Sequence, residues 1–209
     1  METILVNYNF TPEWLKGYPD LSPITIYDRS DDGIQRNLER FGKVIYTPNF
    51  GNVDLDKLGY LVNHYDNLPD VFLWSKSNLF KYITPEEYEK VANNKHFTPL
   101  LTQNHKTYSD QQGVVCYYED GMYYERNNDW YAPQFQSKYC KTYAEFAEMF
   151  RLPNPTYVPF APGGSYILTR ETVHKHPEDF YVKMRDVLPH CQLPLEAYFI
   201  ERSYYQLWK

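Results

Sequence analysis

The sequence predicts an α/β fold, a single domain whose central sheet is mixed, mostly parallel and flanked by helices. The first observation is the order of segments in the first 80 residues, which reads strand, helix, strand, strand, helix, strand. Short apolar strands in this order are typical of α/β sheets with parallel pairing. The second observation is the length of 209 residues, which is typical of one domain with a sizeable core.

The first half of the chain supplies four predicted strands, each a short apolar run that ends at polar residues. A short helix begins at Pro12, since proline is favoured at the first helical position. Residues 53–65 carry apolar side chains at the spacing of one helix face and predict a second helix. The predicted strands are Thr3–Tyr8, Pro23–Asp28, Lys43–Thr47 and Asp70–Trp74.

The second half alternates predicted helices with a tyrosine-rich stretch. Thr84 is the expected N-cap of the helix Pro85–Val91. A hairpin crosses the turn Glu119-Asp-Gly121, and we expect residues 105–143 to form an insertion that lines or covers a cleft. We expect residues 1–100 to form a nucleotide-binding half and residues 101–209 an acceptor-side half. The other predicted elements are the helices Tyr143–Phe150 and Pro177–Leu188, the strand Tyr166–Leu168 and a last helix after Pro194.

Composition excludes several classes of protein. The net charge of −6 argues against nonspecific nucleic-acid binding, which requires a basic surface. No apolar stretch approaches the ~20 residues of a membrane span. The opening Met1–Asn7 has no signal-peptide pattern, and Cys116, Cys140 and Cys191 lack metal-ligand spacing. These features predict a cytoplasmic protein with free thiols, no nucleic-acid partner and no membrane span.

Polar residues follow the predicted strands where parallel sheets bind ligands, beyond the carboxyl ends. Asp28 could accept hydrogen bonds from a uracil N–H or a ribose hydroxyl, although a solvated turn acid is an equal alternative. The planar fork of Arg29 suits a diphosphate. The candidate donor-binding residues are Asn7, Tyr8, Asp28, Arg29, Ser75, Lys76, Ser77 and Asn78.

The acceptor side is predicted around a glycine-rich segment. Glycine lets the backbone approach a sugar closely, so Gly163, Gly164 and Ser165 are candidate sugar contacts. Gln103 and His105 lie in a polar run that could also contact sugar hydroxyls, or could be an ordinary loop.

Glu196 and Glu201 are the candidate general bases. They project about 140° apart on a helix, so we expect only one to face the cleft. Glu196 is preferred, because a helix start favours its ionised form. Glu201 with Arg202 could instead form an ion pair that ties the last helix to the sheet.

The chain resembles small glycosyltransferases of the glycosyltransferase-A fold, in particular the chlorella-virus type that decorates a capsid-protein glycan. The resemblance covers nearly the whole length. It implies transfer of a hexose or deoxyhexose, of the glucose or rhamnose class, from a UDP-sugar to a glycan or glycoprotein acceptor in the host cytoplasm. The segments that carry it are Ile26–Ser30, Tyr65–Phe72, Phe160–Leu168 and Glu201-Arg202.

The resemblance also implies a divalent metal, usually Mn²⁺, at the turn Ser75–Asn78. Related enzymes place two aspartates there, whereas this chain has Ser75 and Ser77, and hydroxyls are weaker ligands for a hard cation. Asp54 and Asp56 match the spacing but begin a helix, where acids more often serve as caps. Related families end the acceptor-side motif in Glu-Asp, and this chain has Glu196-Ala197. The metal ligands therefore stay unassigned: Lys76 or Lys81 could supply some of the missing positive charge, or a metal could bind mostly through the phosphates and water.

Two other functions are compatible with the same residues. A non-catalytic carbohydrate-binding protein could use the 22 tyrosines for stacking, and would need no nucleotide site. A nucleotide-sugar hydrolase would release free sugar without an acceptor. For the transferase we expect direct displacement by the acceptor, which inverts the anomeric carbon, and a retaining reaction stays open because the sequence does not fix which face the acceptor attacks.

Overall fold

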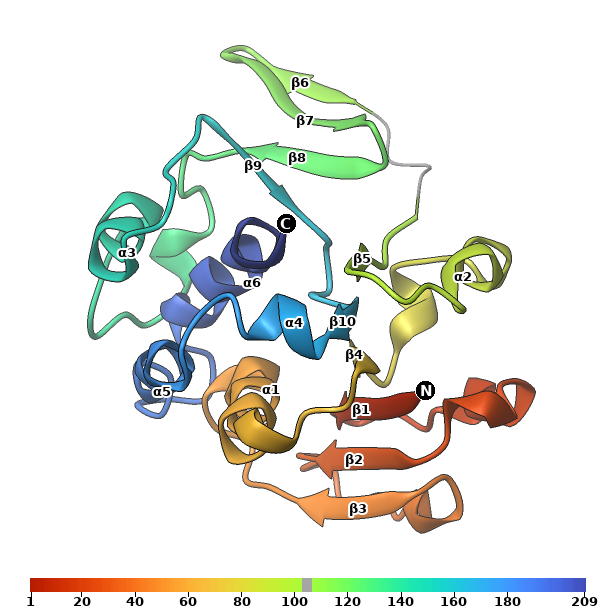
Figure 1. Ribbon diagram of the computed structural model, residues 1–209. Coiled ribbons are helices and arrows are strands. Elements are labelled where there is room, and N and C mark those ends of the chain that lie inside the picture. Colours follow the sequence, from red (N-terminus) through yellow and green to blue (C-terminus); the bar gives the residue numbers. More distant parts are fainter. Residues whose placement is uncertain (103–106) are drawn as a thin grey trace.

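The computed structural model describes residues 1–102 and 107–209 and contains two sheets (Figure 1). The larger sheet has the order β3-β2-β1-β4-β10-β5, and the smaller one has the order β6-β7-β8-β9. The larger sheet consists of β1 (Glu2–Asn7), β2 (Ile24–Asp28), β3 (Lys43–Tyr46), β4 (Val71–Lys76), β5 (Thr98–Pro99) and β10 (Tyr166–Thr169). The smaller sheet consists of β6 (Tyr108–Asp110), β7 (Gly113–Glu119), β8 (Met122–Arg126) and β9 (Tyr157–Phe160).

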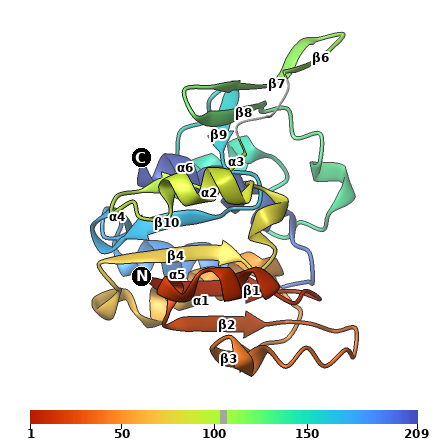
Figure 2. The same ribbon diagram turned by 90° about the vertical axis from the view of Figure 1, so that its right-hand side faces the viewer.

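The larger sheet confirms a mixed, mostly parallel α/β arrangement. β1 pairs in parallel with both β2 and β4, and β2 pairs in parallel with β3. β10 runs antiparallel to β4 and β5. The chain builds outward from β1 to β3 and then returns to the other side of β1 with β4, so the strand order reverses between β1 and β4. Figure 2 shows β2 and β4 pointing in the same direction, with the smaller sheet above them.

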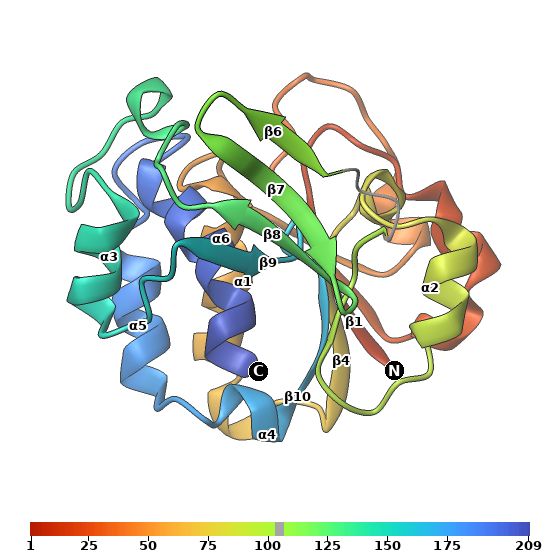
Figure 3. The same cartoon turned by 90° about the horizontal axis from the view of Figure 1, so that it is seen from above.

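Helices cover both faces of the larger sheet (Figures 1 and 3). One face carries the longer helices α1, α3, α5 and α6, and the other carries α2 and the N-terminal 3₁₀ helices. The α-helices are α1 (Asn52–Asn63), α2 (Pro85–Val91), α3 (Tyr143–Phe150), α4 (Arg170–Val173), α5 (Glu178–Asp186) and α6 (Leu195–Trp208). The 3₁₀ helices are η1 (Glu13–Gly17), η2 (Pro19–Leu21), η3 (Leu38–Arg40), η4 (Tyr65–Asn67), η5 (Leu79–Lys81) and η6 (Ala132–Gln134).

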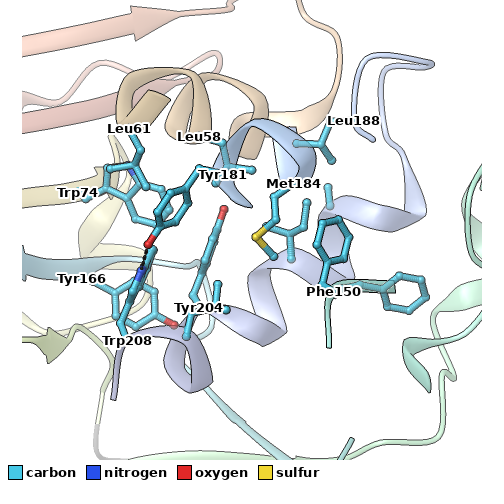
Figure 4. Close-up of a cluster of buried hydrophobic side chains, with 14 of the residues drawn as sticks. Leu58, Leu61, Trp74, Phe150, Tyr166, Tyr181, Met184, Leu188, Tyr204 and Trp208 are labelled. Carbon is cyan, nitrogen blue, oxygen red and sulfur yellow. Dashed lines mark hydrogen bonds between the residues drawn. The ribbon is translucent and has the colours of Figure 1, made fainter. Parts of the chain in front are cut away.

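The core divides into two clusters because alternate strand residues point to opposite faces. Trp74 and Tyr166 pack toward α1, α5 and α6, whereas Leu73 and Ile167 pack toward α2 and η1. On the first side the Trp208 indole donates to the Tyr181 hydroxyl at 3.1 Å (Figure 4). Tyr181 thus carries part of the core while its hydroxyl has hydrogen-bond partners.

Local sequence signals agree with several elements. Thr84 forms a capping box with Glu87, and α2 and α3 have the predicted bounds. The predicted hairpin turn has positive φ at Asp120 and Gly121, as a two-residue hairpin requires. The predicted short helix at Pro12 is the 3₁₀ helix η1, in which Pro12 is the N-cap and not the first helical residue, and β5, β6 and β9 were not predicted. Across the described residues, no helix is both long and apolar enough to cross a membrane.

Candidate functional site

Three predicted donor-binding residues meet at the carboxyl edge of the parallel strands. Asn7 ends β1, Asp28 ends β2, and Ser77 follows β4. The Asn7 amide nitrogen donates to Asp28 Oδ1 at 2.9 Å, and its oxygen accepts a hydrogen bond from the Ser77 hydroxyl. The network spans three adjacent strands at the point of strand-order reversal, where open parallel sheets commonly bind ligands.

Asp28 keeps one carboxylate oxygen available. Its Oδ1 accepts hydrogen bonds from Asn7, from the Ser30 hydroxyl at 2.6 Å and from the Ser30 amide at 3.2 Å. In the part of the chain that the structure describes, no hydrogen bond reaches its Oδ2. Asp28 lines a cavity of about 690 Å³ together with Ser30, Tyr46 and residues 32–39. A space of this size can hold a small organic ligand.

Arg29 does not point toward this cavity. Its guanidinium is buried, donates to the carbonyls of Pro48 and Phe50, and lies 3.5 Å from Asp56 Oδ2. Burial raises the pKa of Asp56 to about 6, although Arg29 acts in the opposite direction. The predicted diphosphate contact of Arg29 is therefore corrected: the side chain ties β2 to the loop before α1.

The serines near β4 are structural, apart from the link between Ser77 and Asn7. Ser75 and Ser165 are fully buried, and their hydroxyl oxygens lie 2.8 Å apart. This bond joins β4 to β10 beneath the surface, so neither hydroxyl can meet a donor or acceptor as predicted. Tyr8 and Asn78 remain solvent-accessible at the same edge, and their roles stay predictions.

The glycine turn before β10 contacts one of the two predicted bases. The Gly163 amide donates to Glu201 Oε1 at 2.8 Å. Gly163 has a φ of 89°, and a Cβ atom there would lie 2.7 Å from the Tyr82 ring. Gly164 also has positive φ and approaches Glu201. Only glycine fits this turn without strain, which explains the Gly-Gly pair in physical terms.

Lys76 lies beside Glu201. Its ammonium is 3.6 Å from Glu201 Oε1, and both side chains are partly exposed, at 20% and 16%. Burial raises the pKa of Glu201, but the nearby Lys76, Arg202, Lys57 and Gly163 amide together lower it by more, and the net pKa lies below the ordinary value. For Lys76, burial lowers the pKa, but Glu201, Tyr82 and Asp54 together raise it by more. A carboxylate and an ammonium, both ionised at neutral pH, therefore meet at the end of β4.

A buried group of polar residues supports this pair from α1. Asp54 accepts a hydrogen bond from the Tyr204 hydroxyl at 2.7 Å, and the Lys57 ammonium donates to the Gly164 carbonyl. Burial lowers the pKa of Lys57 to about 7 and raises that of Asp54. Through this hydrogen bond to Gly164, Lys57 of α1 stabilises the glycine turn. Asp54 and Asp56 face different partners and do not act as a pair.

Glu196 is not at this site. Its side chain is fully buried, Oε1 accepts hydrogen bonds from the amides of Lys138 and Tyr139 at 2.9 and 2.8 Å, and Oε2 lies 2.9 Å from His190 Nε2. Burial raises its pKa, but the hydrogen bonds from backbone amides, chiefly that of Tyr139, and from His190 together lower it by more. The preference for Glu196 as base is therefore corrected, because no acceptor can reach it in this structure.

Glu201 and Arg202, the alternative ion pair, each have a different partner in the structure. Arg202 donates to Glu125 of β8 at 2.6 Å and stacks over the ring of Tyr131 at 3.9 Å. This contact ties α6 to the smaller sheet and leaves Glu201 to Lys76 and Gly163. The candidate sugar contacts Gln103 and His105 lie outside the described residues.

A divalent metal does not fit the residues at the end of β4. The turn offers two buried serines, a lysine and an asparagine, whereas hard cations prefer carboxylates. The nearby Glu201 already meets the Lys76 ammonium, and Lys57 adds a second positive group below. Among residues 1–102 and 107–209, no group of three His, Cys, Asp or Glu could hold a metal. The Mn²⁺ that the resemblance implies therefore finds no suitable ligand set at this turn.

Sequence reasoning missed Lys57 and Tyr82. Lys57 lies three residues after Asp54 and beside the fully buried Leu58, so a charged residue on an apolar helix face was the available signal. The sequence contains no signal for Tyr82, because its ring is brought next to Gly163 by the tertiary structure.

One comparison with known proteins gives a match. A family model described as "Protein of unknown function (DUF3431)" matches residues 12–209. No curated protein and no solved structure matches the chain.

Proposed function

The chain belongs to the DUF3431 family of proteins of unknown function, and we propose that it is a glycosyltransferase of the glycosyltransferase-A type. It would transfer a hexose or deoxyhexose from a UDP-sugar to a glycan acceptor, such as a viral capsid glycan. The observation that carries the proposal is the Lys76–Glu201 pair, which is partly exposed at the same sheet edge as the cavity beside Asp28. An ionised base there can deprotonate the acceptor hydroxyl, and a cation can balance the negative charge of the leaving diphosphate.

The cavity beside Asp28 is the proposed nucleoside site. The available Oδ2 of Asp28 can accept a hydrogen bond from a uracil N–H or a ribose hydroxyl, and Tyr46, with 70% of its surface exposed, offers a ring for stacking. The loop 32–39 closes the other side of the space. Asn7 and Ser77 hold Asp28 in place from β1 and β4.

Glu201 is the proposed general base. Its carboxylate takes the proton of the acceptor hydroxyl as that oxygen bonds to the anomeric carbon of the sugar. The bond between that carbon and the β-phosphate oxygen breaks, and UDP leaves with the bonding pair. Gly163 fixes the carboxylate through its amide, so the base needs little reorganisation when the acceptor arrives.

One observation favours the carbohydrate-binding alternative. On the smaller sheet the rings of Tyr117 and Tyr124 stack at 4.9 Å, and Tyr157 packs edge-on against Tyr117. All three are partly exposed on one face, a surface on which sugar rings can stack. A transferase could bind its acceptor on this face, whereas a carbohydrate-binding protein would need this face alone and no nucleotide site.

Titration calorimetry with UDP, GDP and CMP, followed by transfer assays, tests the proposal. We expect selective UDP binding, and we expect mass spectrometry to show a hexose or deoxyhexose added to an oligosaccharide acceptor from UDP-glucose or UDP-rhamnose. Glu201→Gln should lower the transfer rate strongly and keep UDP binding, with the exposed Glu148→Gln as the matched control. Release of free sugar at an equal rate without acceptor would indicate a hydrolase. No binding of any nucleotide would reject the donor site and favour the carbohydrate-binding protein.

A further inference from the structure

We propose that Lys76 supplies the positive charge that balances the donor diphosphate, in place of a divalent metal. The inference rests on the proposed function and adds to it how the leaving group is recognised. It follows from the mismatch between the residues at the end of β4 and the ligand preference of a hard cation.

The position of Lys76 in the sheet suits a diphosphate. Lys76 pairs with Val6 in β1, one residue before Asn7, and Asn7 pairs with Asp28 in β2. Neighbouring strands lie about 4.8 Å apart, so the backbone at Lys76 is about 10 Å from that at Asp28. A nucleoside seated at Asp28 would therefore direct its phosphates across the ends of β1 and β4, toward the Lys76 ammonium.

The Lys76 ammonium has donors to spare. Within the described part of the chain, Glu201 is the one carboxylate within 4 Å of it, and that distance is 3.6 Å. The centroid of the Tyr82 ring lies 5.6 Å from the ammonium, which makes a cation–π contact. An ammonium carries three N–H groups, so phosphate oxygens can be bound while Glu201 stays close. Lysine is a common phosphate ligand that acts as a point charge.

The surrounding charge also disfavours a metal at this point. Lys57 lies below the glycine turn, and Arg202 follows Glu201 on α6; both lower the pKa of Glu201 from nearby positions. A divalent cation next to Glu201 would have to displace Lys76 and tolerate these two groups. A diphosphate, which is anionic, is attracted by the same arrangement.

Calorimetry of uridine and UDP, each in EDTA and in Mn²⁺, tests the inference on the full chain. The wild type should bind UDP more tightly than uridine in EDTA, and Mn²⁺ should change the ratio little. Lys76→Gln should weaken UDP binding by about ten- to a hundredfold, the contribution of a charge-assisted hydrogen bond, and leave uridine binding unchanged. Lys76→Arg should retain most of the UDP affinity. Lys81→Gln, at an exposed lysine beside the same tyrosine, should match the wild type.

The other outcomes separate this inference from the proposed function. If UDP binds tightly only with Mn²⁺ and Lys76→Gln binds it like the wild type, the inference is wrong and the donor site stands. If Lys76→Gln loses uridine and UDP affinity alike, Lys76 is structural and the inference is also wrong. If neither uridine nor UDP binds under any condition, the proposed function itself falls, and the role of Lys76 with it.

Discussion

The Glu201 carboxylate accepts a hydrogen bond from the backbone amide of Gly163 at 2.8 Å. Gly163 has a left-handed backbone conformation, and the Tyr82 ring fills the space that a side chain would need. The turn therefore presents its amide to the proposed base, and the position of each depends on the other.

Replacement of Glu201 by glutamine should lower the transfer rate by about 10²–10⁴-fold, because a general base contributes that much. The amide is close in shape to the carboxylate, so the melting temperature should change little. Steady-state transfer kinetics with saturating donor measure the effect. A variant with wild-type kcat would remove Glu201 from the reaction.

Replacement of Glu196 by glutamine should affect stability and leave catalysis intact. The carboxylate binds two backbone amides and His190, and charge-assisted bonds of this kind contribute about 1.5–3 kcal/mol each. Because its folded pKa is lowered, this stability is present above the unfolded pKa of about 4.3 and is lost as the pH falls further. Urea denaturation at pH 7 and pH 3.5 should show a larger difference between variant and wild type at pH 7 than at pH 3.5. Loss of kcat in a folded variant would restore Glu196 as a candidate base.

Gly163→Ala should destabilise the protein by about 2–5 kcal/mol, from left-handed strain together with the clash against Tyr82. Gly113→Ala is the matched control, since Gly113 also has positive φ but no atom within 4 Å of the added Cβ. It should cost only about 1–2 kcal/mol. Thermal denaturation compares the two, and equal losses would mean that Tyr82 moves aside freely.

Lys57 should make stability rise with pH in the alkaline range. Its folded pKa of about 7 lies below the unfolded value of about 10.4, so between these pH values the unfolded chain binds more protons. Stability should therefore increase from pH 7 to pH 9.5, by on the order of 2 kcal/mol from this group. Urea denaturation of Lys57→Met should show a smaller increase. An identical slope in both proteins would place the pKa of Lys57 outside this window.

Lys76→Gln should shift the acid limb of the pH dependence of kcat/KM to higher pH. The positive charge of Lys76 is the largest influence that lowers the pKa of Glu201, so its removal raises the pKa of the base. Lys81→Gln should leave the limb in place. An unchanged limb in the Lys76 variant would show that another group than Glu201 titrates in catalysis.

Local patterns were sufficient for most elements of the larger sheet and its helices. The alternation of Ile4, Leu5 and Val6, and that of Phe72, Leu73 and Trp74, serves two faces of a buried sheet. Thr84 marks the start of α2 through its own capping box. The strand β9 escaped prediction, because it contains Pro159 and gains its pairing only from β8, more than 30 residues away.

The sequence alone determined the α/β class and the polar ends of β1, β2 and β4, because local periodicity and chain order bring those ends to one edge. Only the tertiary structure decided which side chains are accessible at that edge. Glu196 and Glu201 share one helix, and the packing of α6 buries the first against residues 138–139 while it presents the second to Lys76. Arg29 and Asp28 are likewise adjacent in sequence, yet one points into the protein and the other into the cavity. A side chain's exposure depends on long-range packing, and neither residue type nor spacing contains that information.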